Sequence, residues 1–289
     1  MNGWIILDKP SGVFSKSASN RVAHIFETKK NGHIGTLDPM ASGVLPIAIG
    51  AATKMVPFLE DFSDRTKEYM FSVIFGYETD TLDITGTETA RCDVVPSVEH
   101  VRSVLPKFIG HISQIPPLFS AIHIDGRRAY ELARSGETPD IPPRDIDVYS
   151  LELLDAVDNR WLFKMSCSPG TYVRSIARDI AKMCGTMATV DMIRRTKTCG
   201  FTLKNAHTLD FLENLVNNGA DVSKYLAPID SGLGDIPVLD IGDRVVGLYK
   251  AGGFIGVDCV DGLRRVYSGD TFIGIGVVVD GVLKPKRTI

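Results

Sequence analysis

The sequence predicts an α+β protein that ends in a small β-rich module, and three patterns support this prediction. Residues 67–77 alternate between two sides of the chain, which is the period of a β-strand. Apolar residues within 173–184 recur at helical spacing, and Gly185 supplies a natural helix stop. After about residue 233, short apolar runs alternate with turn pairs of aspartate and glycine, which is typical of a compact β module.

The remaining elements follow from the same rules. Strands are predicted at 148–154 and 161–167, joined by a turn, and helices at 97–108 and 127–134. The prolines of 136–144 predict a loop. The short runs of the terminal module lie at 254–260, 263–267 and 272–279.

Composition favours a globular intracellular enzyme. The 289 residues are 44% hydrophobic and 23% charged, which allows a sizeable core. No apolar run approaches the roughly 20 residues that a membrane span needs, so we expect a soluble, cytoplasmic protein. The five cysteines show neither a disulfide framework nor the spacing of a zinc site, and we expect them to be reduced.

Charge is uneven along the chain although the net charge is only −3. Residues 174–204 carry seven basic and two acidic side chains. A second basic cluster lies near the carboxyl end and consists of Arg264, Arg265, Lys284, Lys286 and Arg287. Such clusters bind phosphates or form a solvated helix face, and charge alone does not decide between the two.

The most informative segment is 32–46, where three glycines and two prolines surround Asp38. The proline that follows Asp38 disfavours the α region for this residue, and the glycines permit turns and close backbone approach. We therefore expect Asp38 on a rigid loop. A plain structural turn would use the same residue types, because Asp-Pro is a common turn starter.

The whole segment resembles the TruB family of RNA pseudouridine synthases. The shared pattern is Gly-His-x-Gly-Thr-Leu-Asp-Pro-x-Ala-x-Gly-x-Leu-Pro, which continues to Lys54. The resemblance extends over about residues 3–205, with one departure at Phe14, where a threonine is common. Five further stretches carry it: Leu7 to Gly12, Gly76 to Asp83, Gln114 to Ala121, Gly126 to Arg134, and Cys167 to Ser175.

The resemblance implies an architecture. We expect a pseudouridine synthase catalytic domain at 1–233, with a central antiparallel sheet flanked by helices and an RNA-binding cleft across its middle. Residues 234–289 are similar to a PUA-type RNA-binding module. The family implies no cofactor and no metal.

The resemblance also implies three catalytic residues. Asp38 occupies the position of the family's nucleophile, and a carboxylate is ionised at neutral pH and able to leave again. It would attack the sugar C1′, attack uracil C6, or assist loss of a C2′ proton; the sequence does not choose among these paths. Arg174 matches the arginine that pairs with the aspartate, and a guanidinium can hold a carboxylate through parallel hydrogen bonds. Tyr69 matches the tyrosine that stacks on the target base and is a candidate to accept its proton.

Five further residues match substrate-binding positions. A uridine inside folded RNA must be turned out of its stack before a side chain can reach it. His33 matches the family histidine that enters the space left by this base. The other matches are Tyr172 and Ile193, which line the pocket, and Lys9 and Lys54, which lie at basic positions near the site. Core or surface packing is the competing interpretation for these last four.

The implied substrate is the uridine at position 55 in the T-arm loop of transfer RNA. We expect a monomer that needs no obligate protein partner and no membrane. Two other functions remain open: a guide-RNA-dependent synthase of the same family, and a protein that binds and refolds RNA without chemistry.

Overall fold

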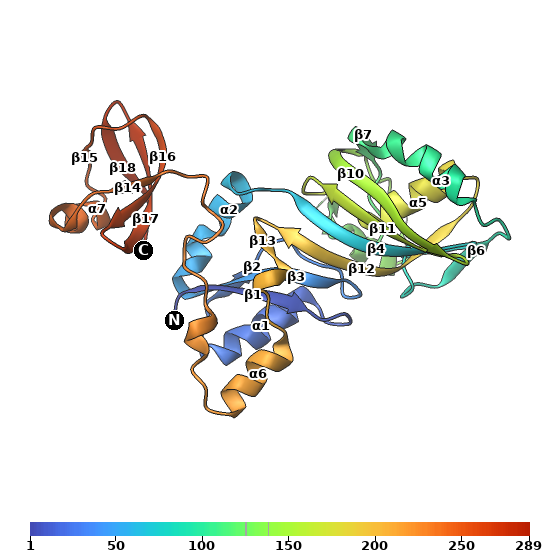
Figure 1. The fold of residues 1–289 in the computed structure, drawn as a ribbon, viewed down its shortest axis with the longest axis horizontal. Coiled ribbons are helices and arrows are strands. Elements are labelled where there is room, and N and C mark those ends of the chain that lie inside the picture. Colours follow the sequence, from blue (N-terminus) through green and yellow to red (C-terminus); the bar gives the residue numbers. More distant parts are fainter. Residues whose placement is uncertain (125, 138) are drawn as a thin grey trace. The chain divides into compact units, whose positions relative to one another are not determined.

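A computed structural model of the chain describes residues 1–124, 126–137 and 139–289 (Figure 1). The chain forms two compact units. We call residues 38–43 and 66–198 the central unit, and residues 1–37, 44–65 and 199–289 the terminal unit. The terminal unit contains the module expected at 234–289 together with the amino terminus, so the boundary between residues 233 and 234 stays a prediction.

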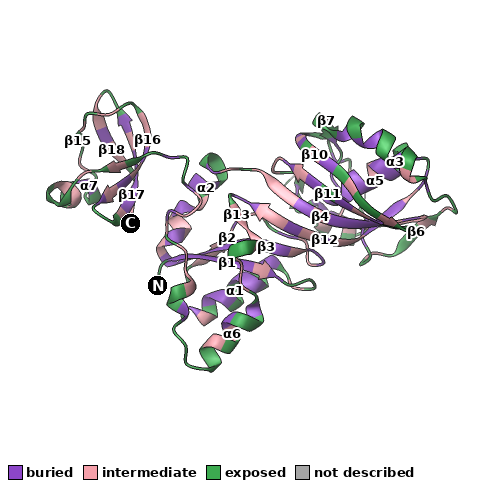
Figure 2. Cartoon of the chain, viewed as in Figure 1, coloured by how far each residue is buried: buried purple, intermediate pink, exposed green. Residues whose placement is uncertain are grey.

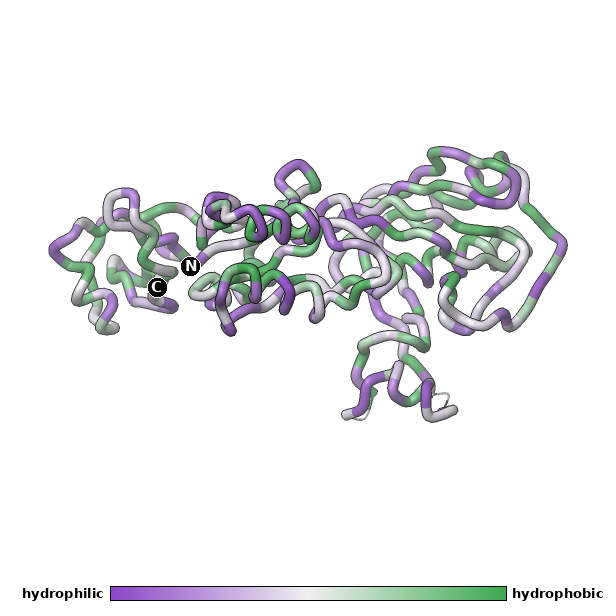
Figure 3. Tube along the Cα trace, turned by 90° about the horizontal axis from the view of Figure 1, so that it is seen from below, coloured by the Kyte–Doolittle hydropathy of each residue, from purple (hydrophilic) through white to green (hydrophobic). Residues whose placement is uncertain are grey.

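The central unit is built on five strands in the order β12-β4-β11-β10-β7, and every pair among them is antiparallel. Their bounds are β4 Lys67–Phe75, β7 Gly110–Gln114, β10 Arg144–Val157, β11 Arg160–Cys167 and β12 Ala188–Thr198. The predicted strands at 67–77, 148–154 and 161–167 are therefore confirmed, the first being two residues shorter because Gly76 adopts a positive φ of 105°. Hydrophobic residues follow these strands in Figure 3.

Register places one row of large apolar side chains on a common face of this sheet. Tyr69 of β4 lies opposite Met165 of β11, and Phe71 lies opposite both Phe163 and Ile193. All five are buried, as Figure 2 shows for much of the sheet. Helix α5 (Val173–Met183) packs against β4 and β12 through the apolar stripe that the sequence predicted.

Shorter elements complete the central unit. They are β5 Tyr77–Thr79, β6 Glu88–Arg91, α3 Val98–Val104, η2 Leu105–Phe108, β8 His123–Ile124, β9 Arg127–Arg128 and α4 Ala129–Arg134. The helix predicted at 97–108 is confirmed, and Ser97 accepts a hydrogen bond from the His100 amide as its N-cap. The helix predicted at 127–134 begins two residues later. Within the predicted loop at 136–144, Thr138 lies outside the described residues.

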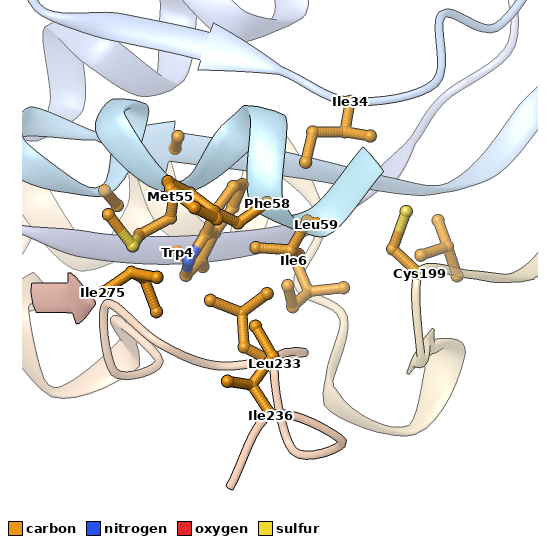
Figure 4. Close-up of a cluster of buried hydrophobic side chains, with 13 residues drawn as sticks. Trp4, Ile6, Ile34, Met55, Phe58, Leu59, Cys199, Leu233, Ile236 and Ile275 are labelled. Atoms are coloured by element: carbon orange, nitrogen blue, oxygen red, sulfur yellow. The ribbon is translucent and has the colours of Figure 1, made fainter. Parts of the chain in front are cut away.

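The terminal unit contains the chain's two ends and a core of its own. Its elements are β1 Gly3–Lys9, α1 Ser15–Ile25, β2 Asn31–His33, most of β3 (Ser42–Ile49), η1 Gly50–Met55, α2 Val56–Phe62, β13 Phe201–Thr202, η3 Leu203–Asn205, α6 Leu209–Asn217 and η4 Val222–Tyr225. Trp4, Phe58, Leu233 and Ile275 belong to one buried cluster, although up to 271 positions of sequence separate them (Figure 4). The β-rich module therefore shares a core with the amino-terminal strand.

The β-rich module is confirmed as a five-stranded sheet in the order β14-β16-β17-β18-β15. Its elements are β14 Val238–Asp240, η5 Asp243–Val245, α7 Val246–Lys250, β15 Ile255–Gly256, β16 Gly262–Ser268, β17 Thr271–Val279 and β18 Val282–Thr288. The run predicted at 254–260 is a strand only at residues 255–256, where β18 pairs with it. The turn at Asp280-Gly281 has positive φ at both residues, as a tight hairpin requires.

Candidate active site

The Asp38 segment is a short turn fixed against a strand. The Ala41 amide donates to the Asp38 carbonyl at 3.1 Å, which closes the turn. Ser42 and Gly43 then pair with β12 in parallel. A Cβ on Gly43 would lie 2.1 Å from the Arg195 carbonyl oxygen, and its φ is 104°, so only glycine fits. Backbone pairing thus begins four residues after Asp38 and restrains the loop that carries it.

Arg174 contacts the Asp38 carboxylate. Its Nη2 lies 2.7 Å from Asp38 Oδ2. The arginine side chain is only 4% exposed, whereas the aspartate side chain is 40% exposed. The same guanidinium donates to the Thr81 carbonyl at 2.7 Å and to the Phe119 carbonyl at 3.1 Å. Because backbone carbonyls hold the buried Arg174 guanidinium in place, the guanidinium in turn holds the exposed Asp38 carboxylate in one orientation.

Asp83 is a second carboxylate beside Arg174, at 3.5 Å from Nη1. Its Oδ1 accepts hydrogen bonds from the Thr85 amide at 2.9 Å and from the Thr81 hydroxyl at 2.9 Å. Leu82, next to it, has a φ of 63°, an unusual conformation for a side chain of this size. The loop 79–86 therefore supplies a buried carboxylate to Nη1 of Arg174, whereas the exposed Asp38 carboxylate contacts Nη2.

Tyr69 lies in the same unit, on β4 opposite Arg195 of β12. The pKa of the Tyr69 phenol is raised to about 12, chiefly by burial and to a smaller extent by the Asp38 charge, while the charge of Arg195 and a side-chain hydrogen bond with it oppose the shift. The phenol is therefore neutral at pH 7. The two roles expected of Tyr69, stacking on the target base and accepting its proton, both stay predictions.

The two predicted pocket residues also belong to the central unit. Tyr172 immediately precedes α5 and is half-buried; burial raises the pKa of its phenol, and the Asp38 charge acts in the same direction, while a hydrogen bond with Ser120 lowers it. Ile193 is buried on β12, and its carbonyl accepts a hydrogen bond from the Ser42 hydroxyl at 3.4 Å. Both electrostatics and hydrogen bonding thus link these residues to the Asp38 segment.

The three other predicted residues belong to the terminal unit. Lys9 is fully buried, and its Nζ donates to the carbonyls of Pro10 at 2.8 Å and Val13 at 2.7 Å. Lys54 donates to the Thr288 carbonyl at 2.8 Å. His33 ends β2, and its Nε2 lies 3.2 Å from the Thr36 hydroxyl. Both lysines thus donate to backbone carbonyls, and their place in substrate binding stays a prediction.

Sequence reasoning missed three contributors to this site. Asp83 and Gln114 lie within the quoted motifs, but their residue types gave no reason to assign a role. Gln114 contacts the Tyr172 backbone with both atoms of its amide. Arg195 is fully buried opposite Tyr69, although the basic run at 174–204 suggested a charged surface. A strand register aligned on Tyr69 would have placed Arg195 beside it.

Among the described residues, no group of histidine, cysteine, aspartate and glutamate side chains is arranged to hold a metal ion. No helix in the described part of the chain is long and apolar enough to cross a membrane.

Comparisons with known proteins identify the family to which this chain belongs. Residues 23–173 match the TruB family pseudouridylate synthase N-terminal domain. Residues 174–234 match the tRNA pseudouridylate synthase B C-terminal domain, and residues 254–289 match the pseudouridine synthase II TruB C-terminal region. The chain belongs to the TruB family of pseudouridylate synthases.

Individual relatives agree. The chain is 42% identical over 296 residues to tRNA pseudouridine synthase B of Ehrlichia chaffeensis, covering 99% of both sequences. It is 46% identical over 245 residues to the enzyme of the same name from Caulobacter vibrioides, covering 84% of this chain and 78% of the relative.

Solved structures confirm the fold. A chain in an H/ACA ribonucleoprotein bound to a substrate RNA containing 2′-deoxyuridine matches with a TM-score of 0.71 at 22% identity, covering 99% of this chain and 84% of the other. A chain in a Cbf5–Nop10–Gar1 complex matches with the same TM-score at 23% identity. At these identities the likeness concerns the fold alone. It agrees with the predicted α+β sheet architecture.

Proposed function

We propose that this chain converts the uridine at position 55 in the T-loop of transfer RNA to pseudouridine, with Asp38 as nucleophile. The single observation that carries the proposal is the Asp38–Arg174 pair, in which a 40% exposed carboxylate is held at 2.7 Å by a buried guanidinium. Membership of the TruB family gives this pair its chemistry, and the names of the relatives give the RNA class.

The reaction breaks the C–N glycosidic bond, turns the uracil and joins its C5 to the sugar C1′, with loss of the C5 proton. Asp38 supplies the electron pair that attacks the nucleotide and later departs. Arg174 contacts Oδ2, and we assign the attack to Oδ1. Because the guanidinium holds the carboxylate in one orientation, the nucleophile is preorganised before RNA arrives.

The uracil base is held by the apolar side of the site. Tyr69 stacks on it as a neutral phenol, and Tyr172 and Ile193 line the pocket. A base that is detached from its sugar must stay within bonding distance, which a buried aromatic surface achieves without a charged contact. The C5 proton passes to water, with the Tyr69 hydroxyl oxygen as the predicted relay, and N1 of the released uracil edge takes up a proton in exchange.

The terminal unit contributes to RNA binding in this proposal. His33 precedes Asp38 by five residues and enters the stack that the flipped uridine leaves. Lys9 and Lys54 stand where the family has basic residues near the site, and each donates hydrogen bonds to backbone carbonyls. The β-rich module binds RNA outside the T-loop. The protein acts as a cytoplasmic monomer, with neither guide RNA nor an obligate protein partner.

The test is incubation of the purified chain with an unmodified T-arm hairpin, followed by mass-spectrometric detection of pseudouridine at position 55. Asp38→Asn keeps the shape of the side chain and removes its charge. We expect it to lower the single-turnover rate at least about 1,000-fold, with RNA affinity within about tenfold, or 1.4 kcal/mol. Pseudouridine formation by the variant at near wild-type rate would reject Asp38 as nucleophile, and product only with an added guide RNA would reject the stand-alone function.

A further inference from the structure

We infer that Gln114 is a positioning residue for this reaction, because it fixes the turn from which Tyr172 and Arg174 reach the site. The inference rests on the proposed function. Gln114 ends β7, is 2% exposed and lies in the central unit. Its Oε1 accepts from the Tyr172 amide at 2.9 Å, and its Nε2 donates to the Tyr172 carbonyl at 3.2 Å.

This pair of hydrogen bonds fixes the residue at which α5 begins, whose carbonyl also accepts the first intrahelical bond, from the Ile176 amide at 3.1 Å. Tyr172 is the N-cap of α5, with extended backbone angles, and its own side chain does not cap the helix. Backbone groups at a helix start lack intrahelical partners and need others. The Gln114 amide binds both backbone groups of one residue, as a neighbouring strand would. Gln114 therefore connects the N-cap residue of α5 to the end of β7.

The segment that follows Gln114 contacts the same helix again. The Ile115 carbonyl accepts from the Ser175 hydroxyl at 2.8 Å and from Arg178 Nη2 at 2.9 Å. Four residues further, the Phe119 carbonyl accepts from Arg174 Nη2, the atom that also contacts Asp38. A shift of residues 114–119 against α5 would move the guanidinium away from Asp38. Gln114 anchors the first point of this contact.

The length and chemistry of glutamine suit this role, and each alternative side chain fails in a defined way. Methionine has similar length and makes neither bond. An ionised glutamate can accept from the Tyr172 amide but cannot donate to the carbonyl. A protonated glutamate restores both bonds, because its O–H donates while the other oxygen accepts. Activity of Gln114→Glu should therefore depend on pH in a way that wild-type activity does not.

The first measurement compares Gln114→Met with Thr189→Val. Thr189 is also fully buried in the central unit and donates to the Tyr77 carbonyl at 3.0 Å, so its loss removes a similar bond without touching Tyr172. We expect Gln114→Met to lower the single-turnover rate 10- to 100-fold, with hairpin affinity within threefold. Thr189→Val should keep the rate within threefold at a comparable loss of thermal stability. Equal rate losses in both variants would overturn the inference.

The second measurement is the pH profile of Gln114→Glu, which decides the question even if the methionine variant fails to fold. Burial raises the pKa of a carboxyl group, so protonation begins within the working range. We expect the rate of the variant, divided by that of the wild type, to rise at least fivefold between pH 8 and pH 6. A ratio that is flat or falls would overturn the inference.

A third measurement separates this inference from the proposed function. Amide hydrogen exchange of residues 169–176, without RNA, should be at least tenfold faster in Gln114→Met than in the wild type, while the strands of the central unit keep their protection. Unchanged exchange there would overturn the inference. Absence of pseudouridine with the wild-type protein would reject the proposed function, and an active wild type with unimpaired Gln114→Met would reject only the role of Gln114.

Discussion

Arg174 and Lys9 are both buried cations from segments that match family motifs, yet they differ in what they hold. Lys9 donates to two backbone carbonyls of its own loop. Arg174 donates to two carbonyls as well, but it also contacts Asp38, whose side chain is 40% exposed. The comparison teaches that burial and motif membership do not mark a chemical residue by themselves. The exposed partner distinguishes a cation that prepares a nucleophile from one that holds a turn.

The sharpest test of this comparison replaces both cations. Arg174→Lys conserves charge but cannot reproduce contacts from two guanidinium nitrogens, and we expect it to lower the single-turnover rate about 100-fold. Lys9→Met should lower the melting temperature, because two backbone carbonyls lose their donor from a fully buried side chain, while the rate stays within about threefold. RNA affinity, measured by filter binding, should change little in either. A Lys9→Met variant of normal stability with a 100-fold slower reaction would break the comparison.

Arg178→Lys is the matched control for the arginine. Arg178 lies on the same helix, one turn beyond Arg174, and its guanidinium contacts Asp179 and the Ile115 carbonyl. Because neither Asp179 nor Ile115 belongs to the Asp38 segment, and a lysine can still donate to the Ile115 carbonyl, the lysine variant should keep most of its activity.

The substitution Asp83→Asn is expected to have the next largest effect on the reaction rate. Asp83→Asn keeps an oxygen for the Thr81 and Thr85 donors but removes the charge at 3.5 Å from Arg174. We expect the rate to fall about tenfold and the free energy of unfolding to fall by about 1–3 kcal/mol. Urea titration measures the second quantity. A stability loss with unchanged single-turnover rate would assign Asp83 to the fold alone.

The sequence predicted the part of this network that local patterns describe. Asp38, Tyr69 and Arg174 stand within motifs, and they lie in one unit as expected. The roles of Asp83, Gln114 and Arg195 were not predicted, because they arise from contacts across more than 50 positions of sequence, such as Gln114 with Tyr172. The alternation of side chains along residues 67–77 predicted β4. The length of β15 could not be predicted in this way, because it is set by pairing with β18 over two residues.

Tyr69 connects the site to stability at high pH. Its folded pKa of about 12 lies above the ordinary value of 10, so the unfolded chain ionises first. The contribution of Tyr69 is therefore complete below pH 10 and is lost as pH rises from 10 towards 12. Between pH 9 and pH 11 the wild type should lose about 1 kcal/mol more stability than Tyr69→Phe.

Urea unfolding at these two pH values measures the difference. Tyr149→Phe, at an exposed phenol, is the control and should lose as much as the wild type. If Tyr69→Phe behaves like this control, the phenol is not buried as described.

The smallest expected effect is on RNA affinity and concerns the basic cluster of the β-rich module. In this cluster, buried cations can be compared with exposed ones. Arg264 is buried and donates to the Leu263 carbonyl at 2.7 Å. Arg265 contacts Asp230 at 2.8 Å. The side chains of Arg264 and Arg265 thus bind groups of the protein itself. Lys286 and Arg287, in contrast, are exposed on β18. We therefore assign phosphate contacts to the exposed pair.

Replacing Lys286 and Arg287 with alanine should weaken tRNA binding about threefold at 0.15 M salt and reduce the log–log salt slope by about 1.4–1.8, since each neutralised phosphate contributes about 0.7–0.9. The single-turnover rate at saturating enzyme should not change. Arg265→Ala is the contrasting variant, expected to lower thermal stability through loss of the Asp230 contact. Deleting the whole module is a poorer test, because Ile275 belongs to the core that contains Trp4. An unchanged slope in the double variant would show that these two cations do not contact phosphates, whereas a slower chemical step would place them closer to the reaction than this assignment allows.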